Sequence, residues 1–184
     1  MNNIYDDKAF FDAYSRMARS TGGLEVAGEW HQLQPLFPAM EGSRVLDLGC
    51  GSGILSIGAL LLGASGATAV DIEENAAATA TENARKNHID PTLYRVFCGN
   101  VLEDETLCRE IGDGYDLICA NIVADVLITM KQLFRQFLRP EGSLIMSGII
   151  MERRDEVLDQ LKKAGFALSH SNKFDIIIEY FHGC

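Results

Sequence analysis

The 184-residue chain has few of the features that mark membrane, secreted or nucleic-acid-binding proteins. Its longest uncharged apolar stretch, Ile54 to Val70, is interrupted by three glycines. That stretch falls short of the roughly 18–20 apolar residues that a membrane span needs. Asp6 and Asp7 stand where a secretory leader would have basic residues before an apolar segment. The sequence therefore favours neither a membrane protein nor a secreted one.

Basic residues are in the minority, with 16 Lys and Arg against 26 Asp and Glu and a net charge of −10. Nucleic-acid-binding proteins usually present a basic face to the phosphates. Two basic pairs, Arg135 with Arg139 and Lys162 with Lys163, indicate either a local basic patch or, more simply, solvated helix faces. We expect no nucleic-acid partner, because an acidic surface suits a small molecule or a basic protein.

Paired cysteines and clustered histidines are also missing. The five cysteines include no C-x-x-C pair, and the four histidines are scattered along the chain. Neither a disulfide framework nor a metal site is indicated by these spacings. Free thiols are typical of a reducing compartment, so the sequence predicts a cytoplasmic protein without a bound metal.

Strands and helices are predicted to alternate along the chain from Arg44 onward. The predicted helices are residues 54–62, 73–87, 101–111 and 123–137, and one more ends at Gly165. The predicted strands are residues 44–48, 67–72, 93–98, 115–120, 143–149, 166–171 and 175–181. This alternation indicates an α/β fold with a mostly parallel sheet of about seven strands and helices on both faces. The last two strands leave no room for a crossover helix, which predicts an antiparallel edge.

A glycine-rich loop follows the first predicted strand, in the sequence Asp47-Leu48-Gly49-Cys50-Gly51-Ser52-Gly53. Glycines between a strand and a helix let a ligand approach the backbone, although a tight turn without a ligand is the alternative. The dinucleotide fingerprint requires a third glycine where Ile54 stands, and the Gly-Lys-Ser/Thr of a phosphate loop is missing. Asp47 would repel a pyrophosphate but attract a cation. The loop therefore favours a ligand with an ammonium or sulfonium group.

Two further polar residues stand at predicted strand ends. Asp71 follows the glycines by about 20 residues, the usual place of an acid that binds ribose hydroxyls, although a solvated Asp is the alternative. Asn100 ends the third strand, where it either meets an adenine edge or caps a helix. A nucleoside combined with a cation, and without phosphate, describes S-adenosylmethionine.

The pattern D-x-G-x-G-x-G followed by Asp71 resembles the class I methyltransferases, which share a Rossmann-like sheet. The resemblance implies that the loop residues hold the methionine end of S-adenosylmethionine, that the residues after the second strand hold its ribose, and that those after the third lie beside its adenine. In this chain these residues are, in that order, Asp47, Gly49, Cys50, Gly51 and Gly53; Asp71 and Ile72; Asn100 and Val101.

Asn121 ends the fourth predicted strand and either caps the following helix or accepts hydrogen bonds from a substrate amine. The stretches VLDLGCGSGILSIGALLLGA, ANIVADVLI and RPEGSLIMSGII resemble the ribosomal protein L11 methyltransferases between Val45 and Phe166. That resemblance implies trimethylation of lysine side chains and of an N-terminal amine. It also implies that Asn121 is the catalytic residue and touches the cofactor.

Residues 1–43 are predicted to be a helical cover segment and residues 44–184 the cofactor-binding domain. The stretch YDDKAFFDAYSRMARSTGGLEVAGEWHQL resembles the amino-terminal cover of a different class I methyltransferase group, often assigned to small molecules. This implies that Tyr14 and Arg19 touch the ligand. The family's own substrate-recognition domain and its Gly-Thr-x-His-Pro-Thr-Thr segment are missing, so the chain is either a divergent natural enzyme or a recombined one.

Together these features predict an enzyme that transfers a methyl group from S-adenosylmethionine to a protein amino group. Because no recognition domain precedes the first strand, we expect weak activity on the ribosomal protein. The alternatives are a small-molecule methyltransferase and a cofactor-binding scaffold of mixed origin without turnover.

Overall fold

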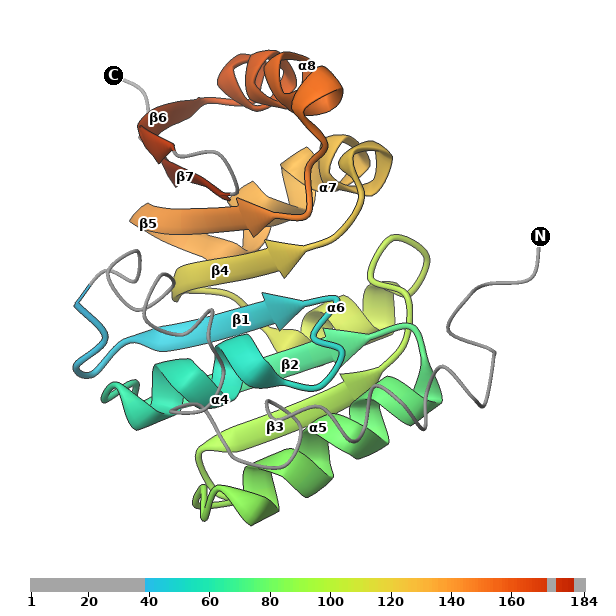
Figure 1. Ribbon diagram of the computed structural model, residues 1–184, viewed down its shortest axis with the longest axis vertical. Helices are drawn as coiled ribbons and strands as arrows, with labels where there is room; N and C mark the ends of the chain where they lie inside the picture. Colours follow the sequence, from blue (N-terminus) through green and yellow to red (C-terminus); the bar gives the residue numbers. More distant parts are fainter. Residues whose placement is uncertain (1–38, 172–174, 181–184) are drawn as a thin grey trace. The chain divides into compact units, whose positions relative to one another are not determined.

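A single sheet runs through the computed structural model, which describes residues 39–171 and 175–180 and places them in a compact unit, Ala39–Cys184. Helices cover both faces of the sheet (Figure 1). The strands are β1 (Arg44–Leu48), β2 (Gly66–Asp71), β3 (Tyr94–Cys98), β4 (Tyr115–Asn121), β5 (Leu138–Ser147), β6 (Phe166–Ser171) and β7 (Asp175–Tyr180). The helices are α4 (Ile54–Leu61), α5 (Glu74–Lys86), α6 (Glu105–Ile111), α7 (Ala124–Phe137) and α8 (Met151–Lys163). The predicted parallel sheet of Rossmann-like type is confirmed.

The strand order is β3-β2-β1-β4-β5-β7-β6, with β1 to β5 parallel and β7 antiparallel to both of its neighbours. The chain moves outward from β1 through β2 to β3, then returns to the other side of β1 at β4. Parallel sheets bind ligands at the carboxyl ends of the strands where the order reverses. In Figure 1 the arrowheads of β1, β2 and β4 point to the same edge of the sheet, which is the edge where sheets of this kind bind ligands.

Alternating side chains of β1 divide the core between the two faces of the sheet. Leu46 and Leu48 are buried in a large apolar cluster with residues from α6, α7 and α8, among them Phe134, which is fully buried. Because successive strand residues point to opposite faces, Asp47 faces the other side, where its carboxylate bonds to Ser56 in α4. The strand that fills the core therefore also presents an acid beneath the glycine loop.

Two element boundaries differ from the prediction. Helix α6 begins at Glu105 rather than near Val101, because the Asp104 carboxylate accepts the first free backbone N–H groups of the helix. Strand β5 begins at Leu138 rather than at Ser143. The register jumps between these two residues, and Glu141 has a left-handed φ of 66° inside the resulting bulge. Helix α7 ends at Phe137, as predicted, and the sequence Pro140-Glu141-Gly142 lies within the bulge of the strand that follows.

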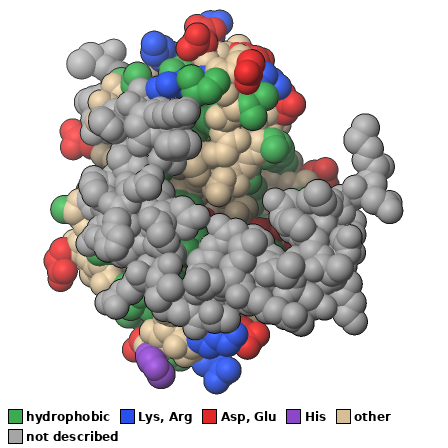
Figure 2. Space-filling model, viewed as in Figure 1, with side chains coloured by type: hydrophobic (Ala, Val, Ile, Leu, Met, Phe, Trp, Pro, Cys, Tyr) green, Lys and Arg blue, Asp and Glu red, His purple; other side chains and the backbone are tan. Residues whose placement is uncertain are grey.

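Charged side chains of both signs are mixed over α8, at the top of Figure 2. Lys163 pairs with Asp159 at 2.6 Å, and Arg153 pairs with Glu156 and with Asp125 of α7. The basic end of α8 is therefore a solvated helix face with acids beside it. None of the helices in the described part of the chain is both long and apolar enough to cross a membrane.

The core on the α7 face should dominate the stability of the domain. Replacing Phe134, which is fully buried, with alanine leaves a cavity and should lower the free energy of unfolding by about 3–5 kcal/mol in urea denaturation. The exposed Gln136 of the same helix provides the control, because Gln136→Ala should change this free energy by about 0.5 kcal/mol or less. A loss for Phe134→Ala no larger than that of the control would contradict this packing.

Candidate functional site

Asp47 is a buried carboxylate with one oxygen bonded and the other free. Its side chain is 1% exposed, and its Oδ2 accepts hydrogen bonds from the backbone N–H (3.1 Å) and the hydroxyl (2.8 Å) of Ser56. Oδ1 has no partner among the residues that the structure describes. Burial raises the pKa of Asp47 from 3.8 to about 6, against the lowering effect of the two bonds from Ser56. A donor from a ligand would satisfy this oxygen and remove the cost of burying it unpaired.

Two hydroxyl groups, those of Ser56 and Tyr94, form a hydrogen-bonded chain that ends at the carboxylate of Asp47. The Oγ of Ser56 lies 3.1 Å from the Oη of Tyr94, which is the first residue of β3. Burial raises the pKa of the Tyr94 hydroxyl, so this group stays protonated and can act as a donor. When Ser56 gives its only hydroxyl proton to Asp47, Tyr94 donates to Ser56. Residues from β3 and α4 thereby fix a carboxylate on β1.

The glycine loop is held by backbone bonds and by α5. The N–H groups of Gly49 and Cys50 both donate to the carbonyl of Val70, and the amide of Asn83 donates to the carbonyl of Ser52 at 2.9 Å. Burial, together with the Asp47 and Asp71 carboxylates, raises the pKa of the Cys50 thiol, which therefore stays protonated. Cys50 thus fits the loop as a small apolar side chain and is a poor nucleophile.

Gly53 shows why the last glycine of the loop cannot carry a side chain. Its φ is 77°, in the left-handed region, and a Cβ atom there would lie 2.7 Å from Tyr94 Oη and 3.0 Å from the Cβ of Ala80. Gly51 has a φ of 51°, and no atom of the described residues lies within 4 Å of the corresponding position. Gly53 thus permits close packing of the loop against Tyr94 and Ala80. Gly51 leaves space beside the loop among the described residues.

Asp71 bonds to the loop while keeping acceptor capacity. Its Oδ2 accepts from the N–H of Gly51 at 2.8 Å, and its Oδ1 accepts from the N–H of Glu73 at 3.0 Å. A carboxylate can accept about four hydrogen bonds, so roughly two acceptor positions are left for hydroxyl groups of a ligand. The adjacent Ile72 is 67% exposed and supplies an apolar surface beside this acid.

Asn100 and Val101 follow β3 and stand next to the end of β2, since Asp71 pairs in register with Cys98. The Oδ1 of Asn100 accepts from the N–H of Leu102 at 3.0 Å and closes a local turn. Asp104, and not Asn100, is the residue that caps α6. Val101 is buried at 8% exposure. Asn100 therefore shapes the loop at the place where the sequence predicts adenine.

Asn121 is exposed at the carboxyl end of β4, beside Ser147 of β5. The residue at the start of α7 is Val123, and no side chain caps this helix. The capping interpretation of Asn121 therefore lacks support. The backbone carbonyl oxygen of Asn121 is 3.8 Å from the position that a Cβ of Gly49 would take, which places Asn121 next to the glycine loop.

The structure thus gathers most of the predicted site residues at one edge of the sheet, at the carboxyl ends of β1, β2 and β4 and on the loops after β1, β2 and β3. Tyr14 and Arg19 lie outside the described residues. Sequence reasoning missed Ser56, Tyr94, Asn83 and Gly148. The first three reveal themselves only through tertiary contacts. Gly148 had a usable signal, because it follows a strand directly, as Gly49 and Gly99 do.

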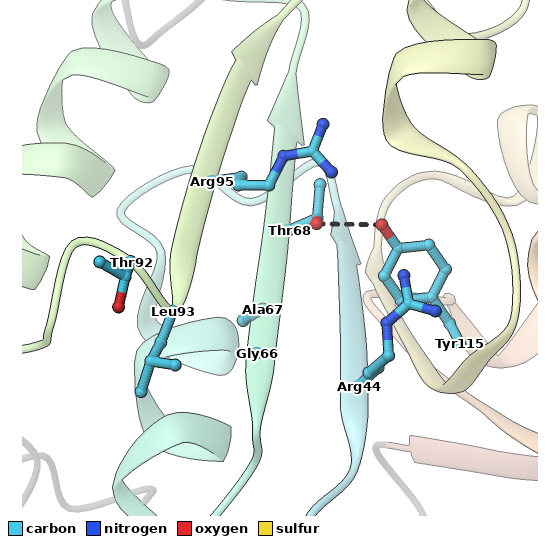
Figure 3. A pocket seen from close by; sticks show the side chains of 8 residues that line it. All are labelled: Arg44, Gly66, Ala67, Thr68, Thr92, Leu93, Arg95 and Tyr115. Carbon is cyan, nitrogen blue, oxygen red and sulfur yellow. Dashed lines mark hydrogen bonds between the residues drawn. The ribbon is translucent and has the colours of Figure 1, made fainter.

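A shallow pocket of about 110 Å³ lies at the opposite, amino-terminal edge of the sheet (Figure 3). Its two guanidinium groups are held by neighbouring groups of the fold: Arg44 bonds to backbone carbonyls of the loop before β4 and stacks on Tyr115, and Arg95 bonds to the carbonyl of Glu110. Tyr115 in turn bonds to Thr68 at 2.9 Å. These contacts join β1, β2 and β4 to one another and β3 to α6, so we interpret the pocket as structural, and it lies away from the predicted site.

The fold is that of the Rossmann-like methyltransferases. A solved structure of an S-adenosylmethionine dependent methyltransferase from Mesorhizobium loti, 19% identical, superposes with a TM-score of 0.65 over 85% of this chain and 100% of that chain. The family model described as "Ribosomal protein L11 methyltransferase (PrmA)" matches residues 32–175. The chain belongs to this family.

Individual relatives agree with this assignment. The ribosomal protein L11 methyltransferase of Acetivibrio thermocellus is 44% identical over 126 residues, which are 68% of this chain and 38% of the relative. The solved ribosomal protein L11 methylase of Lactobacillus delbrueckii subsp. bulgaricus is 29% identical, with a TM-score of 0.67 over 77% of this chain and 72% of that chain. The chain spans between 38% and 57% of the length of the curated relatives that it matches.

The buried acid predicts an unusual pH dependence of stability. Because the pKa of Asp47 is higher in the folded state, folding favours its protonated form, and this contribution is lost as pH rises from 3.8 through about 6. At about 1.36 kcal/mol per pH unit, the loss amounts to roughly 3 kcal/mol.

Urea denaturation of the protein and of Asp47→Asn, from about pH 4 to pH 6.5, measures this loss as the difference between the two curves. The native protein should lose stability relative to the variant over this range, since asparagine does not titrate. Parallel curves would show that the Asp47 carboxyl titrates normally.

Proposed function

We propose that this protein transfers a methyl group from S-adenosylmethionine to an amino group of a protein. Residues 44–184 would form the cofactor-binding domain, and residues 1–43 would cover the ligand. The observation that carries this proposal is the unpaired Oδ1 of Asp47 beneath an open glycine loop. A buried carboxylate oxygen of this kind suits a cationic donor, and the family of the chain supplies a ligand that has one.

The residues at the strand ends fit the three parts of S-adenosylmethionine. Asp47 and the loop from Gly49 to Gly53 would hold the cationic methionine end. The two acceptor positions left on Asp71 would take the ribose hydroxyls. The exposed side chain of Ile72 would pack against the nucleoside, next to the turn formed by Asn100. A dinucleotide would fit less well, because its pyrophosphate would face the carboxylate of Asp47. S-adenosylmethionine has no phosphate.

The reaction requires alignment more than proton transfer. S-adenosylmethionine supplies a methyl group that is activated by its bond to the positively charged sulfonium sulfur. Asn121 would accept a hydrogen bond from the substrate amine through its side-chain oxygen and direct the nitrogen lone pair. Such alignment contributes about 7–11 kcal/mol in favourable cases. The exposed position of Asn121, at the end of β4 and next to the glycine loop, supports this role.

A lysine substrate must lose a proton before it can react. From a free pKa near 10.4, deprotonation costs roughly 4–5 kcal/mol at pH 7. Removal of the amine from water on docking would lower its pKa and reduce this cost. The net charge of −10 would attract a basic protein. Ribosomal protein L11, the substrate in the names of the relatives, is the acceptor that we propose.

The described cysteines Cys50, Cys98, Cys108 and Cys119 are all free. This agrees with a protein that works in a reducing compartment, and it supports the cytoplasmic location that the sequence predicts.

The ribose role of Asp71 can be tested by calorimetry with S-adenosylhomocysteine. Asp71→Ala should weaken binding by about 1.5–3 kcal/mol, because hydrogen bonds to a charged acceptor are lost. Asp104→Ala is the matched control, since this carboxylate also accepts two backbone N–H groups near the same edge. The control should cost about 1 kcal/mol in stability and leave the affinity unchanged. Equal affinities of both variants would remove Asp71 from the cofactor site.

Methyl transfer itself can be tested with purified ribosomal protein L11 and S-adenosylmethionine labelled in the methyl group. The native chain should transfer label to lysine or N-terminal amines, at the low rate that the sequence predicts. Asn121→Ala should lose most of this transfer while its affinity for S-adenosylhomocysteine stays within about twofold, because the amide acts on the acceptor. Full turnover by the variant would show that Asn121 has no part in the chemistry, and absence of transfer by the native chain would refute L11 as the acceptor.

A further inference from the structure

The residue that follows β5, Gly148, lies directly against the side chain of Asn121. In the register of the sheet Asn121 is opposite Ser147, so Gly148 continues β5 alongside the Asn121 amide. A Cβ atom on Gly148 would be 2.6 Å from Oδ1 and 3.8 Å from Cγ of Asn121. The tip of the Asn121 side chain therefore occupies the space that any other residue at position 148 would fill.

The backbone at this position also favours glycine. Gly148 has a φ of 77°, in the left-handed region. The residue is exposed, so core packing does not demand a small side chain here. Among the described residues, the three atoms nearest to a Cβ at this position all belong to Asn121.

A second glycine bounds the other side of the same segment. A Cβ atom on Gly49, at the end of β1, would overlap Cγ2 of Ile122. Strands β1 and β5 flank β4 on its two sides. The segment Asn121–Ile122 thus lies between two glycines, each directly after a strand. Ile122 lies against Gly49, and the amide of Asn121 lies against Gly148.

We propose that Gly148 is a positioning residue that sets the direction of the Asn121 amide and thereby the alignment of the acceptor amine. This inference rests on the proposed function of Asn121. A methyl group at position 148 would meet the free end of a side chain that can rotate, so the fold would tolerate it while the amide turned away. A displacement of about 1 Å at a reacting group can slow a reaction by about 100-fold.

The test compares Gly148→Ala with Gly42→Ala. Gly42 has a similar φ of 72°, and no atom in the described part of the chain lies within 4 Å of its Cβ position, so the control reproduces the backbone strain without the contact. With ribosomal protein L11 as acceptor, Gly148→Ala should lower kcat by about 10–100-fold, with KM for S-adenosylmethionine within about twofold. Gly42→Ala should keep kcat within about twofold. Equal kcat values for the two variants would overturn the proposal.

A double-mutant cycle shows whether Gly148 acts through Asn121. In the Asn121→Ala background, adding Gly148→Ala should change the residual rate by less than about twofold, because the group being positioned is gone. The same fold-loss in both backgrounds would mean that Gly148 acts by another route.

An NMR measurement separates this inference from the proposed function. The side-chain amide signals of Asn121, assigned by their loss in Asn121→Ala, are recorded in the presence of S-adenosylhomocysteine. They should shift in Gly148→Ala and stay in place in Gly42→Ala. Unshifted signals in Gly148→Ala refute the positioning role, whether or not L11 is methylated. Shifted signals without methylation by the native chain uphold the positioning role and refute the acceptor.

Discussion

The candidate site depends on one carboxylate that is buried before any ligand is bound. Asp47 cannot move to water, because it lies in the middle of the sheet and is held by Ser56 in α4. Only one of its two oxygens is satisfied in the described structure. The unpaired oxygen lowers the stability of the folded protein relative to one in which both oxygens are hydrogen-bonded. It is also the atom at which a hydrogen bond from a cation would contribute most binding free energy.

Around this acid the fold places groups that, under the proposed function, would act on different parts of a ligand. The acid and glycines after β1, the acid after β2 and the amide after β4 come from strands that are adjacent in the sheet. Their spacing is set by the parallel register, and no loop conformation is needed to bring them together. The opposite edge is closed instead by Arg44, Thr68 and Tyr115, whose contacts join the same strands from below. Under the proposed function, ligand would bind at the carboxyl-terminal edge of the sheet, whereas the contacts at the amino-terminal edge stabilise the fold.

Much of this arrangement was predictable from local patterns. Alternating strand and helix periods indicate the sheet, and residues such as Asp71 and Asn121 are identifiable because they stand where a strand ends. The hydrogen-bonded chain from Tyr94 through Ser56 to Asp47 was not predictable, since Tyr94 lies 38 residues from Ser56 along the chain and meets it only in the folded state. The bulge in β5 also escaped prediction. The strand runs through Pro140 because Leu138, directly after the end of α7, already pairs with Tyr115.

The bonds that Asp71 makes to its own backbone have a thermodynamic consequence. Its carboxylate already anchors the N–H of Gly51 in the glycine loop and the N–H of Glu73 at the start of α5. A nucleoside that arrives at this edge meets a loop whose conformational entropy has been lost during folding rather than during association. Less of the binding enthalpy is then offset by ordering of the protein, and the same fixed loop favours any ligand of this shape, whether or not its methyl group has been transferred. Under the proposed function, release of the demethylated product would therefore rely on differences at the sulfur rather than on opening of the loop.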